Sequence, residues 1–325
     1  MTDGGYNPCH RNLKFIKLRG TRVRKDGLRL LLNTCLALEG LRCNVMDILQ
    51  ALSTYIKDDQ ARYDGSSLTL KYFDFSSCYQ IFSSKLHFLM NLREVRIGAD
   101  VPPECKTSSR KHRNDFKLKP PTEEVCHGLL FLGSLRNLET LVLKDLNENE
   151  LEAALGSCGM LLRRLEIHFM SSGVNLEVIN QLAPNITTLL ISDSKIICST
   201  DHDHTKKYFF KNLSQCRLMR VYYENRSETC ILSHCDLKTL YQESAPAITD
   251  DLIDALIDNN KLQNLEELIF TGICFLSTQS LIKIMQLPSI SLVGDIMDWS
   301  ISRQQYETFL SKHKESWKTS KKVIK

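Results

Sequence analysis

The sequence has no long apolar run and no apolar segment near its N-terminus. None of its 325 residues lies in a stretch that approaches eighteen consecutive apolar positions, and residues 1–25 hold no apolar run between their charges. We therefore expect no membrane span, no secretory signal and a cytoplasmic or nuclear location. In such a compartment thiols stay reduced, so we expect the 12 cysteines to be small core residues rather than six disulfides.

Signatures of catalysis are absent as well. The sequence has no Gly-Lys-Ser/Thr phosphate loop, no His-Glu-x-x-His and no Gly-x-Ser-x-Gly. Two groups have the residue types of metal ligands: Asp201, His202, Asp203 and His204 with Cys198, and Cys230, His234 and Cys235. Neither contains the Cys-x-x-Cys pair of a structural zinc site. We expect no enzyme, no cofactor and no metal.

Positive charge is concentrated in three segments, residues 1–30, 106–119 and 312–325, which together carry 20 basic and 4 acidic residues. The rest of the chain has 22 basic and 34 acidic residues. The run 110–113 could be a nuclear-import signal or an anion-binding patch, or simply a solvated face. Aromatic residues are not interleaved with the basic residues near the N-terminus, so we do not expect nucleic-acid binding.

One pattern recurs along the chain, in which apolar residues occupy positions 1, 4 and 6. It starts at Leu13, Leu38, Leu70, Leu92, Leu138, Leu162, Ile186, Leu218, Leu237, Leu265 and Leu287. Most of the spacings lie near the 20 to 29 residues of a leucine-rich repeat. Segments with helical spacing lie between these motifs, as at Leu151 and Leu155. Strand and helix are thus predicted to alternate within one short unit.

The motifs and their surroundings resemble leucine-rich repeats, particularly the cysteine-containing kind that follows F-boxes in ubiquitin-ligase substrate receptors. The resemblance is carried by the run Asn12 to Cys43, by Ile248 to Leu252 followed by Asn264 to Leu268, and by Cys158 and Cys216 ahead of strand motifs. It implies an α/β leucine-rich repeat solenoid, a horseshoe with short parallel strands on the concave face and helices on the convex face. Only eleven residues precede Asn12, where the first repeat opens, so we expect an F-box only in a longer form.

The pattern divides the chain into three parts. Residues 1–11 form an N-terminal segment, and residues 12–298 form the solenoid, with loop insertions near 100–125 and 192–207. Residues 299–325 are predicted to form a polar helix and a basic C-terminal tail.

Strand positions 3 and 5 of each motif should point outward and form the concave surface on which a protein partner binds. Large aromatic and charged side chains, which often anchor interfaces, occupy many of them: Phe15, Arg42, Tyr72, Arg96, Arg164, Glu166, Arg220, Tyr222 and Tyr241. We expect a non-enzymatic protein-interaction module, and the resemblance implies substrate recognition for an SCF-type ubiquitin ligase, whose subunits would be further partners of an F-box form. A leucine-rich scaffold or inhibitor without a ligase role and a nuclear nucleic-acid-associated protein stay open as alternatives.

Overall fold

The structure, a computed structural model, describes residues 12–18, 23, 27, 30–31, 34–35, 37–42, 72–75, 92–97, 129–197, 210–223, 231, 237–294, 299–313 and 322–323. The chain divides into two compact units, Met1–Leu162 and Arg163–Lys325.

The first unit is built on short parallel strands. These are β1 (Phe15–Lys17), β2 (Gly40–Arg42), β3 (Tyr72–Phe75), β4 (Glu94–Ile97) and β5 (Thr140–Lys144), each hydrogen-bonded to the next. The short helix η6 (Leu130–Ser134) precedes β5, and α4 (Glu148–Cys158) and η7 (Gly159–Leu161) follow it. The strand register aligns the same motif position in every repeat, because Val95 pairs with Leu141 and Ile97 with Leu143.

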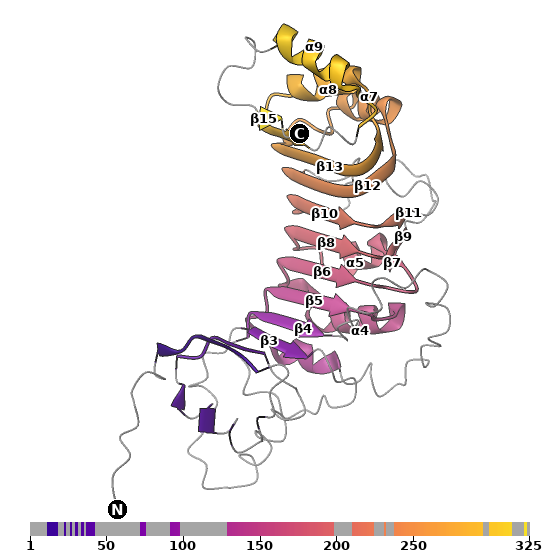
Figure 1. The fold of residues 1–325 in the computed structure, drawn as a ribbon. Helices are drawn as coiled ribbons and strands as arrows, with labels where there is room; N and C mark the ends of the chain where they lie inside the picture. The colour runs from indigo at the N-terminus through magenta and orange to yellow at the C-terminus, as the bar shows by residue number, and fades with distance from the viewer. Residues whose placement is uncertain are drawn as a thin grey trace, which may run out of the picture. The chain divides into compact units, whose positions relative to one another are not determined.

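The second unit continues the same plan with longer strands (Figure 1). Its sheet runs in the order β6 (Arg164–His168), β8 (Thr188–Ser192), β10 (Gln215–Met219), β12 (Thr239–Thr249), β13 (Glu267–Phe275), β14 (Leu292–Gly294) and β15 (Lys322–Val323), all parallel. The helices are α5 (Leu176–Leu182), α7 (Asp250–Asp258), α8 (Thr278–Gln286) and α9 (Arg303–His313).

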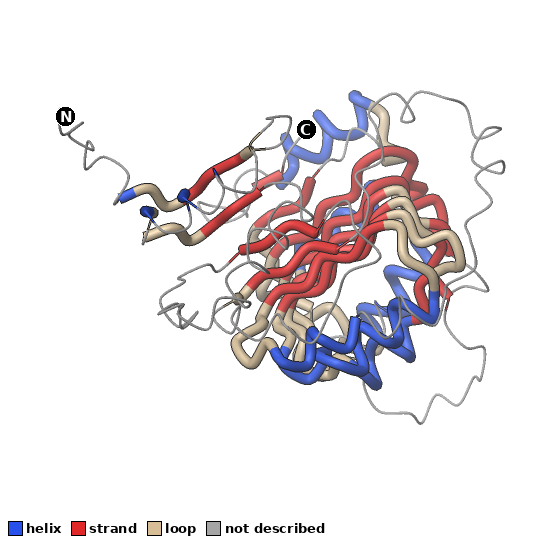
Figure 2. Tube along the Cα trace, turned by 90° about the horizontal axis from the view of Figure 1, so that it is seen from below, coloured by secondary structure: helices blue, strands red, loops and turns tan. Residues whose placement is uncertain are grey.

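A second, smaller sheet in this unit consists of β7 (Val174–Asn175), β9 (Lys195–Ile197) and β11 (Tyr222–Tyr223), in the order β11-β9-β7. Figure 2 shows the strands of the large sheet stacked in one layer, with helices in another. Parallel strands that alternate with helices or short extended segments in units of about 25 residues are the architecture of leucine-rich repeats. The predicted fold class, an α/β leucine-rich repeat protein, is confirmed.

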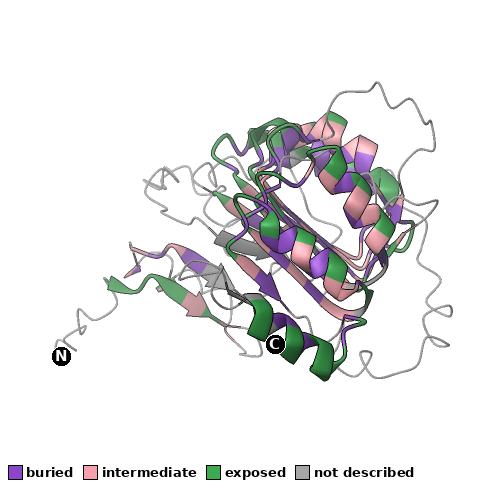
Figure 3. Ribbon diagram, turned by 90° about the horizontal axis from the view of Figure 1, so that it is seen from above, coloured by how far each residue is buried: buried purple, intermediate pink, exposed green. Residues whose placement is uncertain are grey.

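The core lies on the inward side of the strands, where the apolar motif positions meet (Figure 3). Leu165, Leu189, Leu240 and Leu268 are at most 1% exposed. Burying one leucine side chain completely contributes about 1.5–3 kcal/mol. Repetition of the motif therefore supplies each strand with a similar hydrophobic anchor.

Polar residues fix where the helices begin. The Asn147 side chain accepts a hydrogen bond from the Glu150 amide (3.1 Å), and the Glu150 carboxylate accepts one from the Asn147 amide (2.9 Å). This reciprocal capping box satisfies two amides that the first turn of α4 leaves without helical partners. The side chains of Asn175, Thr249 and Ser277 each accept one hydrogen bond from an amide in the first turn of α5, α7 and α8.

Two of the predicted strand motifs are wrong in register. The motif predicted from Leu218 begins instead at Leu213, because β10 spans Gln215–Met219, and the motif predicted from Leu287 begins at Ile290, because β14 starts at Leu292. With these corrections the repeat starts from Leu138 onward are 24, 24, 27, 24, 28 and 25 residues apart. Cys216 consequently lies inside β10 and not ahead of a strand.

Further differences concern segments predicted to be irregular. Strand β9 lies within the predicted insertion at 192–207, and β15 lies in the predicted basic tail, where it pairs with β14. The insertion near 100–125 and most of the basic segments lie outside the described residues.

Among the cysteines that the structure describes with their side chains, Cys35, Cys158 and Cys216 are buried and reduced. No helix in the described part of the chain is long and apolar enough to cross a bilayer.

Candidate protein-binding surface

The outward side chains of the second unit's sheet form three rows that run across the strands. The strand register defines them. The first row is Arg164, Thr188, Gln215, Thr239, Glu267 and Leu292; the middle row is Glu166, Leu190, Arg217, Tyr241, Ile269 and Gly294; the third row is His168, Ser192, Met219, Glu243 and Thr271.

The middle row has a cation over an aromatic ring at its centre. The Arg217 guanidinium carbon lies 4.5 Å from the centroid of the Tyr241 ring, within the range of a cation–π interaction. The Tyr241 hydroxyl lies 3.4 Å from Oγ1 of Thr271 on the next strand. Leu190 and Ile269 stand on either side of the pair and are half-buried. The row therefore presents an apolar, a cationic, an aromatic and another apolar side chain on four successive strands.

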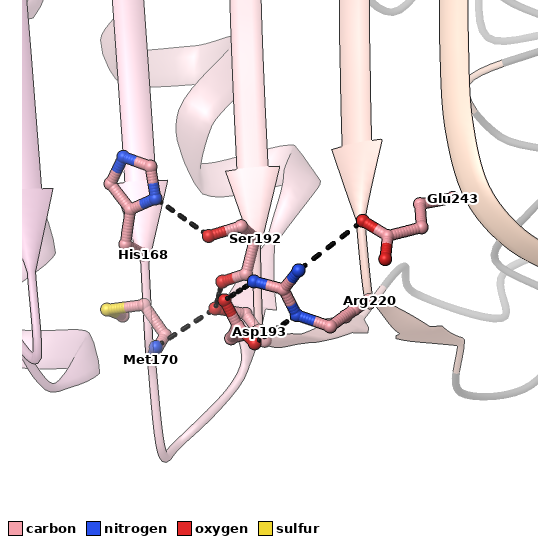
Figure 4. Close-up of polar contacts among 7 residues, drawn as sticks. His168, Met170, Ser192, Asp193, Arg220 and Glu243 are labelled. Carbon is pink, nitrogen blue, oxygen red and sulfur yellow. Dashed lines mark hydrogen bonds and ion pairs between the residues drawn. The ribbon is translucent and has the colours of Figure 1, made fainter. Parts of the chain in front are cut away.

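Charges at the start of the sheet are paired within it. Arg164 donates to Oε1 of Glu166 through both Nε and Nη2 at 2.7 Å, and Oε2 of Glu166 lies 3.6 Å from Nε2 of His168. His168 Nδ1 is 2.7 Å from the Ser192 hydroxyl (Figure 4). A polar chain thus links β6 to β8, and the Arg164 charge is neutralised by a carboxylate that is itself largely buried.

Ser192, His168 and Glu166 have the composition of an acyl-transfer triad, but their placement does not suit that chemistry. A nucleophilic hydroxyl must reach a substrate carbonyl at about 3–3.5 Å. Ser192 is only 3% exposed, so a substrate cannot approach Oγ without moving the strands. The chain of contacts instead joins the polar ends of two strands.

Strands β6, β8 and β10 are each followed directly by a residue with left-handed backbone conformation, namely Phe169 (φ 60°), Asp193 (φ 51°) and Arg220 (φ 50°). The Phe169 amide donates to the Ser192 carbonyl and the Asp193 amide to the Met219 carbonyl. This conformation turns the chain sharply out of the sheet at the same point in each repeat. It also places the side chains of Asp193 and Arg220 side by side at the carboxyl ends of β8 and β10.

Arg220 forms ion pairs with two carboxylates, those of Asp193 and Glu243 (Figure 4). Its Nε and Nη2 donate to the two carboxylate oxygens of Asp193 at 2.7 and 2.8 Å, and its Nη1 donates to Glu243 at 3.4 Å. The hydrogen bonds to Asp193 raise the pKa of Arg220, so it is always charged. The buried hydroxyl of Ser194, the residue after Asp193, accepts a hydrogen bond from the Met170 amide and donates one to the Ser192 carbonyl.

The predicted site residues fall into three groups. Arg164, Glu166 and Tyr241 lie in the outward rows of the second unit, whereas Arg220 and Tyr222 follow the end of β10 and lie outside those rows. In the first unit, Phe15 is 65% exposed on β1 and Arg96 is half-buried on β4, where it pairs with Glu94. Arg42 and Tyr72 lie in β2 and β3, and their side chains lie outside what the structure describes.

Arg217 was not predicted, because the motif shifted to Leu218 assigned the outward fifth position to Tyr222 and the third position to Arg220. The repeat period contains the missing signal: Leu213 follows Ile186 by 27 residues and precedes Leu237 by 24. A motif that starts at Leu213 puts Arg217 at the outward fifth position. Arg217 was therefore present in the sequence, at an outward position that the shifted motif missed.

The described part of the chain contains no group of three or more His, Cys, Asp or Glu residues that is arranged to hold a metal ion. The ligand candidates of the two sequence groups, Cys198 and residues 201–204, and Cys230, His234 and Cys235, lie outside the described residues.

Comparison with known proteins gives no family. No protein-family model matches the chain, and no curated protein sequence matches it. Solved structures that are similar in fold include an internalin, inlF, from Listeria monocytogenes, with a TM-score of 0.46 and 13% identity over 97% of this chain and 80% of that one. Another is the TLR13–ssRNA13 complex, with a TM-score of 0.46 and 17% identity over 87% of this chain. The aligned region spans 34% of the TLR13 chain.

Proposed function

We propose that this chain is a non-enzymatic protein-binding module whose binding surface is the outward face of the second unit's sheet. The observation that carries the proposal is the middle row, in which Arg217 and Tyr241 stack between Leu190 and Ile269. Tyrosine and arginine anchor protein interfaces because each combines a large contact area with directed polar groups. A row of such groups on a rigid sheet is preorganised for a partner.

The alternative functions have less support in the described residues. The Ser192 hydroxyl, the one candidate nucleophile beside a histidine in the rows, is buried. Three arginines point out from the edge and face of the second unit's sheet, but Arg164 and Arg220 are paired with carboxylates. A nucleic-acid surface needs several unpaired cations that follow a phosphate backbone. A protein surface needs a few anchors among neutral contacts, which is what the rows contain.

Photo-crosslinking from chosen positions tests the surface. A photoreactive amino acid in place of Gln215, exposed on the sheet face, should give covalent adducts with a partner protein in cell extract. The same residue in place of Gln286, exposed on α8, is the matched control and should give none. Equal adducts from both positions, or adducts only from Gln286, would move the binding surface away from the sheet.

A finer proposal is that the module recognises substrates for an SCF-type ubiquitin ligase, as its resemblance to F-box leucine-rich repeat receptors implies. Cys35 and Cys158 support it, since both are buried at helix ends just ahead of strands. Pull-down with a full-length product that carries an F-box should recover the ligase scaffold. Recovery of a partner at Gln215 without any ligase subunit would favour a scaffold or inhibitor instead.

A further inference from the structure

We propose that the middle row binds an extended acidic segment of a partner protein, in which one carboxylate is flanked on each side, two residues away, by an apolar side chain. This inference rests on the proposed function and specifies the partner's chemistry. Arg217 binds the carboxylate, and Leu190 and Ile269 contact the two apolar side chains.

Arg217 differs from Arg164 and Arg220 because no carboxylate in the described part of the chain forms an ion pair with it. Its side chain is exposed, and in the described part of the chain no acidic group forms an ion pair with it. Arg164 and Arg220 each bind a carboxylate at 2.7 Å. Arg217 is therefore the cation on this face that remains available to a carboxylate from outside.

Tyr241 holds the Arg217 guanidinium in place. The ring lies 4.5 Å from the guanidinium carbon and stabilises the cation without using its N–H groups. A planar guanidinium whose donors remain available can bind a carboxylate through two parallel hydrogen bonds. Because the ring already restricts the side chain, less conformational entropy is lost when a ligand binds.

The positions of the flanking residues fix the spacing in the ligand. Leu190, Arg217, Tyr241 and Ile269 lie on successive strands, and neighbouring strands are about 4.8 Å apart, so Leu190 and Ile269 are separated by about 14 Å. An extended peptide repeats its side-chain direction every two residues, about 6.7 Å, and spans about 13.4 Å in four. A segment that crosses the strands thus places residues i and i+4 over the two apolar side chains and residue i+2 over the Arg217–Tyr241 pair.

Acidic groups around the row restrict the ligand to a single carboxylate. Glu267 lies in the first row on the strand of Ile269, and Glu243, which Arg220 contacts at 3.4 Å, lies in the third row on the strand of Tyr241. The negative charges of these glutamates repel a phosphorylated segment or a nucleic acid more strongly than they repel a ligand with a single negative charge. One carboxylate between neutral neighbours pairs with Arg217 and brings the least negative charge near these glutamates.

Fluorescence anisotropy with defined peptides tests the inference. The probe is a fluorescein-labelled peptide with the core Leu-Ser-Glu-Thr-Leu, compared with peptides that carry Gln, Lys or phosphoserine at the central position. For the intact chain we expect the Gln peptide to bind about tenfold or more weakly than the Glu peptide, because a charged hydrogen bond to a carboxylate is lost. Arg217→Ala should weaken the Glu peptide similarly and leave the Gln peptide unchanged. Arg163→Ala, which removes an exposed arginine outside the three rows, is the matched control.

Charge reversal gives the sharpest result. Arg217→Glu should lose the Glu peptide and bind the Lys peptide in its place. The inference is overturned if the intact chain binds the Glu and Gln peptides within twofold of each other, binds none of them, or prefers phosphoserine to glutamate by more than tenfold. If a partner still crosslinks from Gln215 in such a case, the proposed function stands and the acidic ligand alone is wrong; if that crosslink is also absent, both fail.

Discussion

Asp193 and Arg220 occupy equivalent positions after two neighbouring strands, and their side chains form two parallel hydrogen bonds of 2.7 and 2.8 Å. Both residues have positive φ angles, 51° and 50°. The carboxyl side chain of Asp193 is 10% exposed, whereas that of Arg220 is 50% exposed. The pair therefore combines an unfavourable backbone conformation with a nearly buried anion that depends on one arginine.

Replacement of Arg220 separates these two effects. Arg220→Ala should lower the free energy of unfolding by about 1–3 kcal/mol, because it leaves the Asp193 carboxylate without its donor. Arg220→Gly removes the same donor but adopts the left-handed conformation freely, so it should be more stable than Arg220→Ala by about 1 kcal/mol. Urea denaturation measures both variants. A glycine variant less stable than the alanine variant would show that the backbone at this position is not strained.

The sequence predicted the fold because the repeat motif reports inward packing directly. Leu165, Leu189 and Leu240 recur at strand positions where only an apolar side chain fits the core. The predicted register was wrong at β10, where the segment that follows the strand is also apolar. Val221 and Tyr223 complete an apparent strand motif that starts at Leu218. Tyr223 lies in β11 of the small sheet and Val221 directly precedes it, and the sequence did not predict this strand.

The candidate site was predicted only in part, for a related reason. Outward positions follow from the strand register, so a shift of five residues in one motif replaced Gln215 by Arg220 and Arg217 by Tyr222. The contact between Arg217 and Tyr241 joins strands that are 24 residues apart in the chain. No local pattern reports such a contact, and it becomes visible only when the strands pair.

Inward and outward residues of the sheet should differ sharply in their effect on stability. Leu240 is fully buried, so Leu240→Ala should lower the free energy of unfolding by about 2–5 kcal/mol through lost burial and a new cavity. Arg217→Ala on the adjacent strand should change it by about 0.5 kcal/mol or less, because the side chain is exposed. Thermal unfolding followed by circular dichroism compares the two. A larger loss for Arg217→Ala would mean that the assigned sides of the sheet are reversed.

Gln242 is an amide at an inward position that other strands fill with leucine, isoleucine or phenylalanine. It is 1% exposed, and its Nε2 atom has no hydrogen-bond partner among the residues that the structure describes. An unsatisfied buried donor costs about 1–3 kcal/mol, so Gln242→Leu should raise the free energy of unfolding by an amount of that order. Urea denaturation provides the measurement. If Gln242→Leu is instead destabilising, the amide must bind a group such as an internal water, and Gln242→Glu would then be tolerated no better.

Asp250 joins the first turns of two helices, α7 and α8. Its Oδ1 accepts hydrogen bonds from the Ser277 amide at 2.9 Å and from the buried Ser280 hydroxyl at 2.5 Å. Burial opposes ionisation, but these hydrogen bonds and the charge of Lys283 outweigh it and lower the pKa of Asp250 below its ordinary value of 3.8. The ionised carboxylate therefore binds its partners more strongly in the folded chain than water binds it in the unfolded chain.

The stability that Asp250 contributes should depend on pH in one direction. Because the folded pKa is the lower one, the contribution is complete above the unfolded value of about 3.8 and is lost as the pH falls through the folded value. Asp250→Asn keeps an acceptor but not the charge, so it should cost about 1 kcal/mol at pH 7 and progressively less below pH 3.8. Asp251→Asn, in the same helical turn and exposed, is the control and should change stability little. Urea denaturation between pH 2.5 and 7 checks both variants, and a difference between Asp250→Asn and the native chain that stays constant across this range would contradict the proposed role of the charge.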